Sequence, residues 1–197
     1  MLLHMSGQLS AVALREVVGN PEELRALQRV MESDEDFALR VTGHPPGPAH
    51  VQSTLMFVPE GKSPDDKVVF GVWVGGELVG VLDLLLRYPD QETVYVGLLL
   101  IDRAWQGRGI GGVACQALER EVLVGWPWVR RLRLSVVRTN DQVLGFWRRM
   151  GFVETGEVRP YRYDKLQSEV ILMDKPVAER HGSWSSPPAS PNRDGSL

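Results

Sequence analysis

The stretch Gln106-Gly107-Arg108-Gly109-Ile110-Gly111 lies between an apolar run, Val94 to Ile101, and a segment with helical spacing of apolar residues. The β-branched and aromatic residues of the run predict a buried strand. The helical segment carries apolar or small residues at Ile110, Val113, Ala114, Ala117, Leu118 and Val122. A glycine-rich loop at a helix N-terminus binds phosphate well, because glycines let the backbone come close and the unpaired N–H groups and helix dipole favour negative charge. The stretch therefore predicts a site for a phosphorylated cofactor.

The spacing Gln/Arg-x-x-Gly-x-Gly/Ala in this loop resembles the acyl-CoA-binding signature of the GNAT superfamily of N-acetyltransferases. A later run, Asn140-Asp141-Gln142-Val143-Leu144-Gly145-Phe146-Trp147-Arg148-Arg149-Met150-Gly151-Phe152, resembles the same family's second motif, a helix that starts at Asn and ends in Gly-Phe. The two blocks come in the family's order, and the order of expected elements extends the resemblance from about Leu9 to Val177. The resemblance implies an α+β fold with a mixed central sheet of about seven strands flanked by about four helices.

Two other interpretations of the loop fit the sequence less well. Gly109-x-Gly111-x-x-Ala114 satisfies the dinucleotide fingerprint, which requires an acidic residue at the end of the next strand. That strand, Leu132 to Val137, is followed by Arg138, and no Asp or Glu precedes Asp141. The nucleotide P-loop pattern has no match in the chain. A tight turn without a ligand stays open, but acyl-CoA explains the loop best.

Composition predicts one ordinary globular domain in 197 residues. The formal net charge of −3 gives no reason to expect nucleic acid. The single cysteine, Cys115, excludes an intramolecular disulfide, suits the cytoplasm and is expected to be a small buried hydrophobe. No stretch approaches the ~18 apolar residues of a membrane span, and Met1 to Gln8 is too short and mixed for a signal peptide. We expect a cytoplasmic protein with no nucleic-acid or membrane partner; whether it forms a homodimer stays open.

Local patterns predict the remaining elements. Asn20-Pro21-Glu22-Glu23 has the N-cap, first-turn proline and N3 glutamate that begin a helix, and Glu32 to Asp36 is expected to end it. Thr42 to Pro48 contains three prolines and two glycines, which predict an irregular and functional loop. The other predictions are strands over Leu9–Val18, Phe152–Val158 and Ser168–Met173, a helix over Ala49–Met56, and a hairpin of Val68–Val74 and Leu78–Leu86 across Gly75-Gly76. Residues 1–178 form the expected domain, and residues 179–197 are expected to be a disordered tail.

The resemblance also assigns the residues that hold acetyl-CoA. It places the pantetheine arm in a gap where the Val94 strand and the Leu132 strand part, and the pyrophosphate on the N–H groups from Gln106 to Gly112. Arg108 is a candidate for a charge-assisted phosphate contact. Asn140 is expected to cap its helix, to contact the cofactor arm, or both. The implied cofactor contacts are Leu99, Leu100, Ile101, Gln106, Gly107, Arg108, Gly109, Ile110, Gly111, Gly112, Asn140, Phe146 and Trp147.

The expected catalytic groups depart from the family pattern. Many members have Tyr where this chain has Trp147, and an indole N–H cannot give up a proton at useful pH. Trp147 is therefore expected to pack against the cofactor arm, while water or another tyrosine protonates the thiolate, or the thiolate leaves unprotonated. Some members use a Glu as base near the position of Tyr95, which is not acidic but is kept as a candidate catalytic residue. Asp83, in an apolar strand, is the preferred base, with Glu92 and His44 as weaker candidates and water-mediated deprotonation still open. No metal site is expected.

The resulting functional hypothesis is an acetyl-CoA-dependent N-acetyltransferase that acts by direct attack of a primary amine, most simply the amine of a small molecule. The acidic cluster Glu32 to Asp36 suits a cationic substrate, although a solvated helix end explains it equally well. Two alternatives remain, which are acetylation of protein N-termini or lysines and a CoA-binding sensor without catalysis.

Overall fold

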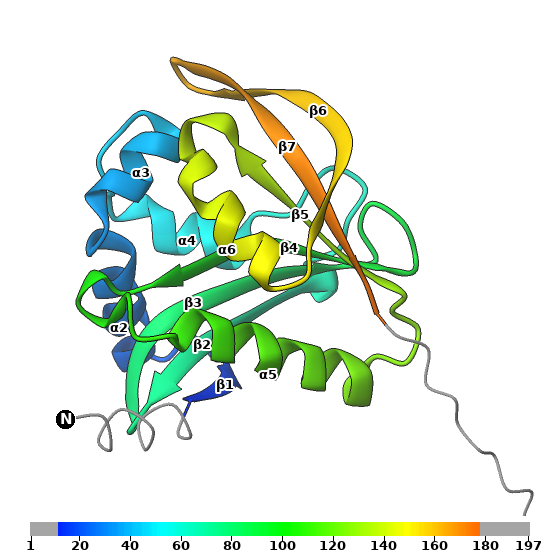
Figure 1. Cartoon of the computed structure of the whole chain (residues 1–197). Helices are drawn as coiled ribbons and strands as arrows, with labels where there is room; N and C mark the ends of the chain where they lie inside the picture. Colours follow the sequence, from blue (N-terminus) through cyan, green and yellow to red (C-terminus); the bar gives the residue numbers. More distant parts are fainter. Residues whose placement is uncertain (1–11, 178–197) are drawn as a thin grey trace, which may run out of the picture.

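The computed structural model describes residues 12–177, and these form a seven-stranded mixed sheet flanked by helices (Figure 1). The strand order is β1-β2-β3-β4-β5-β7-β6. All neighbouring strands are antiparallel except β4 and β5, which are parallel. The strands are β1 Val12–Glu16, β2 Lys67–Val74, β3 Glu77–Leu86, β4 Thr93–Ile101, β5 Arg131–Val137, β6 Val153–Tyr163 and β7 Leu166–Pro176. The predicted α+β class with about seven strands is confirmed. The predicted tail, residues 179–197, lies outside the described residues.

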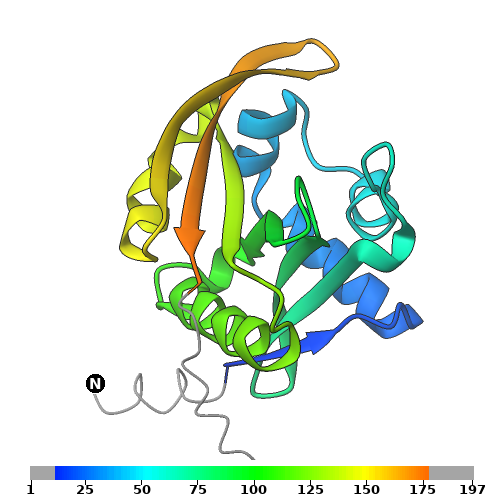
Figure 2. The same ribbon diagram turned by 90° about the vertical axis from the view of Figure 1, so that its right-hand side faces the viewer.

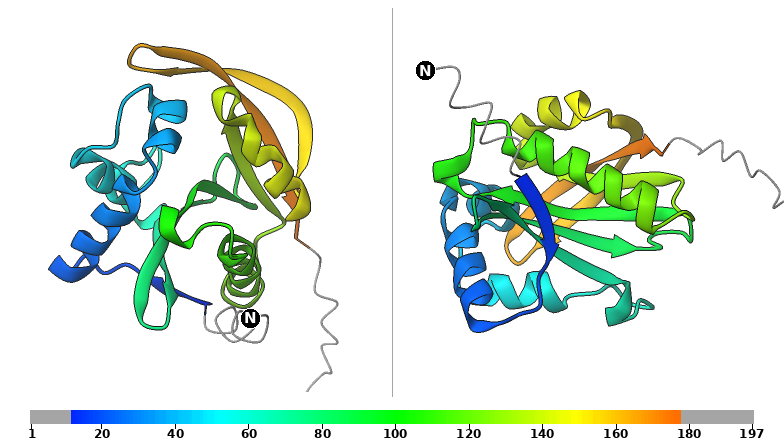
Figure 3. Two further views of the ribbon diagram at one scale, coloured as in Figure 1. Left: turned by 60° about the vertical axis from the view of Figure 1, so that its left-hand side comes forward. Right: turned by 90° about the horizontal axis from the view of Figure 1, so that it is seen from below.

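Five α-helices and three short 3-10 turns connect these strands. The helices are α2 Pro21–Glu32, α3 Glu35–Thr42, α4 Ala49–Met56, α5 Ile110–Gly125 and α6 Leu144–Arg149. The 3-10 turns are η1 Pro64–Asp66, η2 Arg103–Trp105 and η3 Arg138–Val143. In Figure 3, α2 and α3 lie to one side of the parted strands β4 and β5, and α6 lies to the other.

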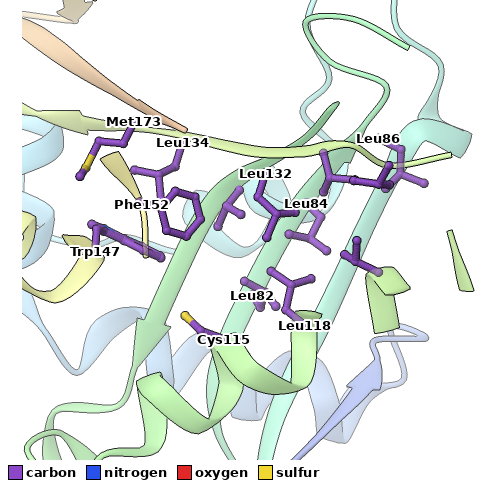
Figure 4. Packing of buried hydrophobic residues seen from close by; sticks show 14 of the residues in the cluster. Leu82, Leu84, Leu86, Cys115, Leu118, Leu132, Leu134, Trp147, Phe152 and Met173 are labelled. Carbon is purple, nitrogen blue, oxygen red and sulfur yellow. The ribbon is translucent and has the colours of Figure 1, made fainter. Parts of the chain in front are cut away.

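The alternation of residues along β3 divides the core between two faces of the sheet. Leu82 and Leu84 pack with Leu118 of α5, whereas Val81 packs with Leu27 of α2. Figure 4 shows the first of these clusters, in which α5 and Trp147 of α6 cover the same face. Because neighbouring strand residues point to opposite faces, α2 and α4 cover one face, and α5 and α6 cover the other.

Helix α2 begins as the sequence predicts. The Asn20 side chain accepts hydrogen bonds from the Glu22 and Glu23 N–H groups, at 3.1 and 3.0 Å. Pro21 occupies the first turn, and the Glu23 carboxylate reaches back to the N–H groups of Val18 and Gly19. These contacts satisfy amides that have no partner inside the helix.

Helix α3 was not predicted from the sequence. The acidic stretch was expected only to end α2, but the Asp34 side chain accepts a hydrogen bond from Phe37 N–H at 3.0 Å and caps a new helix. Glu35 and Asp36 then occupy the first turn, where negative charge is favourable. The predicted helix over residues 49–56 is confirmed as α4, and the proline-rich loop joins α3 to it.

Strand β6 continues beyond the predicted end at Val158 to Tyr163, β7 extends beyond its prediction at both ends, and the hairpin arches away from the rest of the sheet in Figure 2. Almost every residue of β6 is exposed, because β6 is the edge strand. Its pairing with β7 shifts between Glu154 and Val158. The prediction followed apolar runs and therefore underestimated the length of both strands, which also contain many polar residues.

The parting of β4 and β5 is the feature that positions the site. Their pairing runs only from Thr93↔Arg131 to Val96↔Leu134 and then stops, and the two strands diverge (Figure 1). At the same level β4 has a bulge, because Asp83 of β3 pairs with Leu98 and Leu84 pairs with Val96, which leaves Gly97 unpaired. The gap between the parted strands was predicted from the resemblance and is confirmed.

Candidate functional site

A cavity of about 720 Å³ occupies the space between the parted strands. Leu98 to Ile101 of β4 form one wall, and Ser135 to Val137 of β5 form the opposite wall. Part of α3 lies on one side of it, and Phe146 and Trp147 of α6 lie on the other. The glycine-rich loop and the first turn of α5 close the end nearest the last residue of β4.

The loop has the geometry of a phosphate cradle. Gly107 and Gly109 have φ values of +73° and +81°, a region that side chains rarely adopt. These two residues turn the chain so that α5 begins at Ile110 and presents its first-turn N–H groups to the cavity. Gly111 is less constrained, since a Cβ there would lie 3.5 Å from the Phe146 ring, an ordinary van der Waals contact. The predicted loop residues, apart from Arg108, therefore line one cavity.

Gln106 and Arg108 behave differently from each other. The Gln106 side chain donates hydrogen bonds to Ile101 O and to Asp34 Oδ2, both at 2.9 Å, and so ties the loop to the end of β4 and to the start of α3. The Arg108 guanidinium donates to Ala104 O at 2.9 Å and lies over the Trp105 ring, and Arg108 does not line the cavity. In this structure, therefore, the backbone of the loop forms the cradle without the Arg108 side chain.

Two carboxylates of the acidic cluster, those of Asp34 and Asp36, share one arginine partner. Arg103 Nη1 lies 3.2 Å from Asp34 Oδ1 and 2.9 Å from Asp36 Oδ2. Burial alone would raise the pKa of Asp34, but the hydrogen bonds from Gln106 and Phe37 N–H and the charge of Arg103 hold it below its ordinary value. Asp34 and Asp36 therefore join α3 to η2 and to the loop. That the cluster attracts a cationic substrate stays a prediction.

Asn140 does not cap its helix, so that interpretation was wrong. Helix α6 begins at Leu144 with no side-chain cap, and Asn140 lies in η3 with φ −117° and ψ 29°. Its buried Oδ1 instead accepts a hydrogen bond from Arg40 Nε at 2.9 Å. With its amide oxygen turned toward Arg40, Gln142 accepts a second bond from Nη2 at 2.8 Å. Arg40 of α3 thus bonds two residues of η3 along the cavity, and no sequence pattern predicts these contacts.

Trp147 and Phe146 form the aromatic wall. Trp147 is only 8% exposed and packs edge-to-face against Phe146 and Phe152, with ring centroids 5.0 and 5.3 Å apart. Figure 4 shows the Trp147 and Phe152 rings beside Met173. This environment agrees with the packing role expected for Trp147. Phe146, one of the implied cofactor contacts, is half-buried and lines the cavity.

Asp83 lies outside the cavity lining. Its side chain is buried, with Oδ2 at 2.9 Å and Oδ1 at 2.8 Å from Lys67 Nζ. Burial raises the pKa of Asp83, and the attraction of Lys67 opposes this only in part. The carboxylate lies against the bulge, where a Cβ on Gly97 would come within 2.9 Å of Oδ2. The geometry shows an ion pair between Asp83 of β3 and Lys67 of β2. The role of Asp83 as a base stays a prediction.

Tyr95 also lies outside the cavity lining, but its hydroxyl contacts Ser135, which lines the cavity. Tyr95 Oη is 2.6 Å from Ser135 Oγ. Tyr88 packs edge-on against the Tyr95 ring at 5.6 Å, and burial raises the pKa of Tyr95. Ser135 was not predicted as a site residue, because the sequence shows only a small polar residue between Leu134 and Val136 in an alternating strand.

Three other residues that the sequence singled out lie apart from this cavity. His44 Nε2 contacts Asp164 Oδ2 of the β6–β7 hairpin at 2.7 Å. Glu92 lies near the opposite end of β4, beside a smaller cavity. Cys115 is buried in the core under α5, as expected, and burial raises the pKa of its thiol to about 12.

Two features are not found within residues 12–177. No helix there combines the length and apolarity that crossing a membrane requires. In the same part of the chain, no three or more His, Cys, Asp or Glu side chains gather in a way that could hold a metal ion.

Comparison with known families agrees with the geometry. The model described as the acetyltransferase (GNAT) family matches residues 29–152. An acetyltransferase from Thermus thermophilus is 31% identical in sequence, with a TM-score of 0.60, and the match covers 84% of this chain and 97% of that one. Comparison with curated protein sequences finds no significant match.

More distant structures share the fold. An acetyltransferase from Salmonella typhimurium, which modifies the N-terminal serine of 50S ribosomal subunit protein L7/L12, is 17% identical with a TM-score of 0.68, and the match covers 86% of this chain and 96% of that one. A Bacillus subtilis acetyltransferase in complex with CoA is 14% identical with a TM-score of 0.55, covering 85% and 99%.

Proposed function

Because the chain belongs to the GNAT family of acetyltransferases, we propose that its cavity binds acetyl-CoA and transfers the acetyl group directly to the primary amine of a small molecule. The observation that carries this proposal is the gap between β4 and β5, which ends in the glycine-rich loop. Backbone groups of Leu98 to Ile101 have no β5 partner in this gap and are available to the amides of a pantetheine arm.

The residues present fit this cosubstrate. The loop offers N–H groups and a helix N-terminus to the pyrophosphate, and Gly107 has open space where a side chain would stand. Phe146 and Trp147 provide an apolar wall for the arm. Holding the thioester and the amine together supplies much of the rate enhancement in such a reaction, because a bimolecular step becomes intramolecular.

A small acceptor is favoured by a contact at the edge of the cavity. Tyr161 Oη on β6 donates to Val41 O on α3 at 2.7 Å, and Val41 lines the cavity. This contact ties the β6–β7 hairpin to α3 beside the site. An extended peptide needs an open groove, and the contact favours a compact amine over a protein N-terminus or lysine.

The test is release of free CoA from acetyl-CoA across three groups of acceptors, which are small primary amines, peptides with free N-termini, and peptides whose only amine is a lysine. We expect turnover to be highest with a small amine. Faster turnover with either peptide group would contradict the acceptor class. If the protein binds acetyl-CoA but releases no CoA with all three groups of acceptors, the CoA-binding sensor would be favoured.

A further inference from the structure

Tyr95 and Ser135 lie at the point where the two walls of the cavity meet. The last pair between β4 and β5 is Val96↔Leu134. Ser135 is the next residue on β5 and lines the cavity, whereas Tyr95 is the residue before Val96 on β4. Their hydroxyl oxygens are 2.6 Å apart, so one hydrogen bond crosses the closed end of the gap.

This end of the cavity lies away from the phosphate cradle. The glycine-rich loop follows the last residue of β4, while Leu98 and Ser135 are lining residues that come soon after the last strand pair. At about 3.3 Å per residue, Leu98 lies roughly 10 Å along β4 from Ile101. A cosubstrate with its pyrophosphate on the loop therefore directs its thioester toward Ser135.

The direction of the hydrogen bond follows from the acidity of the two groups. A phenol is a stronger donor than an aliphatic hydroxyl, and burial raises the pKa of Tyr95, so the phenol keeps its proton. Tyr95 then donates to Ser135 Oγ. Among residues 12–177 the Ser135 hydroxyl has no other hydrogen-bond partner, which leaves its own proton free to point into the cavity. A donor whose oxygen already accepts a bond is strengthened by it.

We propose that Ser135 donates a hydrogen bond to the sulfur of acetyl-CoA as the C–S bond breaks, and that Tyr95 is the positioning residue that orients the Ser135 hydroxyl. This inference rests on the proposed function. The amine nitrogen forms the new bond to the carbonyl carbon, and the electron pair of the C–S bond leaves on sulfur. The proton lost by the nitrogen passes to water and then to the thiolate. Ser135 shares its proton without transferring it, because an aliphatic hydroxyl is a much weaker acid than a thiol.

Ser135 would stabilise the negative charge on the leaving sulfur, whereas Trp147 cannot protonate it. An indole N–H does not transfer its proton at useful pH, and Trp147 is packed between Phe146 and Phe152. Ser135 on β5 faces the gap from the side opposite the β4 backbone. One hydrogen bond to a charged group stabilises it enough to change a rate about ten- to a hundredfold.

The first test measures binding without turnover. If Ser135 donates to sulfur, the protein binds the thiolate of CoA in preference to the thiol, so the affinity for CoA should rise about tenfold as pH increases through the ordinary thiol pKa of about 8.5. The buried Tyr95 phenol keeps its proton over this range, because its pKa is raised. Desulfo-CoA, which has no thiol, should show no such rise. Calorimetric titrations at pH values from about 6.5 to about 9.5, on either side of that thiol pKa, compare the two ligands.

Ser135→Ala should abolish the pH-dependent gain in CoA affinity, leave binding of desulfo-CoA unchanged, and lower kcat about ten- to a hundredfold with little change in KM. Ser135→Thr retains the hydroxyl and should recover most of both properties. Tyr95→Phe keeps the ring but not the donor, and should reduce both the pH-dependent gain and kcat by a smaller factor. Ser53→Ala, on the exposed face of α4, makes the same chemical change away from the cavity and should alter neither.

Three results would overturn the proposal. One is an unchanged pH-dependent gain in CoA affinity in Ser135→Ala, whatever happens to kcat, because Ser135 would then not contact sulfur. Another is a wild-type protein that binds CoA and desulfo-CoA with the same pH dependence. The third is a wild-type protein that binds neither ligand, which removes the proposed function and this inference with it.

Discussion

At the scale of single residues, Gly109 carries the most demanding position in the loop. It precedes the first residue of α5 and has a φ of +81°. Gly109→Ala should weaken acetyl-CoA binding modestly, because it adds strain alone, and Gly109→Glu should abolish binding, because it also places a negative charge beside the pyrophosphate. Fluorescence titration of both variants measures the difference.

Gly61 provides the matched control for that pair of variants. It has a φ of +80°, has no atom within 4 Å of the position of a Cβ, and lies in the surface loop before β2. Gly61→Glu should therefore introduce similar strain and charge without changing acetyl-CoA affinity. Equal affinity in Gly109→Glu and wild type would rule out the loop as the pyrophosphate site.

Trp147 offers a second test at this scale. Its rings contact Phe146 and Phe152, so its assigned role is packing and not proton transfer. Trp147→Phe should keep acetyl-CoA binding and most of the turnover, whereas loss of a general acid costs about 10²- to 10⁴-fold. A drop in kcat of about a thousandfold with normal binding would show that the indole takes part in the chemistry.

Some of these residues could be predicted from the sequence and others could not. Gly107, Gly109 and Gly111 are visible because a backbone cradle leaves a spacing pattern in the chain. Ser135 leaves none, since one serine in an alternating strand is indistinguishable from any half-exposed residue. Arg40 reaches Asn140 from a position a hundred residues away, and no local pattern encodes that meeting.

At the scale of elements, Lys67 at the start of β2 and Asp83 in β3 form a buried ion pair between neighbouring strands. Asp83→Asn leaves the Lys67 ammonium without its partner and should lower the free energy of unfolding by about 3 kcal/mol. The double variant Lys67→Met/Asp83→Leu should be at least as stable as wild type, because well-packed apolar residues replace two desolvated charges. Denaturant unfolding of wild type and both variants measures these differences.

The same pair has a pH signature. Burial raises the pKa of folded Asp83 above its ordinary value of 3.8. The stability that this protonated carboxyl contributes is present below pH 3.8 and is lost as pH rises through the folded pKa. The double variant should lack this part of the pH dependence. The pH–rate profile of Asp83→Asn tests the base hypothesis and is measured at a temperature at which the variant is folded. A profile that matches wild type would show that Asp83 is not the base.

Whole elements were predicted where local signals agreed with tertiary structure. Asn20 and Pro21 begin α2, and Gly75-Gly76 joins β2 to β3, as the sequence indicated. Helix α3 was missed because the same acidic residues suit both the end of one helix and the cap of the next. Asn140 was misassigned because its preferred partner, Arg40, comes from α3 and not from its own helix.

At the scale of the whole molecule, the described sheet is complete before the predicted domain boundary. Strand β7 ends at Pro176, and its pairing with β5 extends to Arg131↔Pro176. A protein shortened to residues 1–178 should therefore keep its acetyl-CoA affinity and its melting temperature within about 3 °C, which corresponds to roughly 1 kcal/mol for a chain of this size. Differential scanning calorimetry of both lengths measures the effect. A larger drop would mean that residues 179–197 contribute to folding.

The early end of the β4–β5 ladder also has a mechanical consequence. The β-ladder between β4 and β5 has only four residue pairs, and the strands β1–β4 and β5–β7 are otherwise joined by side chains, among them the Tyr95–Ser135 hydrogen bond and the core under α5. Backbone amides beside the gap are therefore expected to exchange with solvent through local opening, well before the sheet unfolds. A cosubstrate seated between these two groups of strands adds about 2.7 kcal/mol at a hundredfold excess over its Kd. Acetyl-CoA bound in the gap should therefore stabilise the contact between β1–β4 and β5–β7. Amide hydrogen exchange should slow in both groups of strands when it binds.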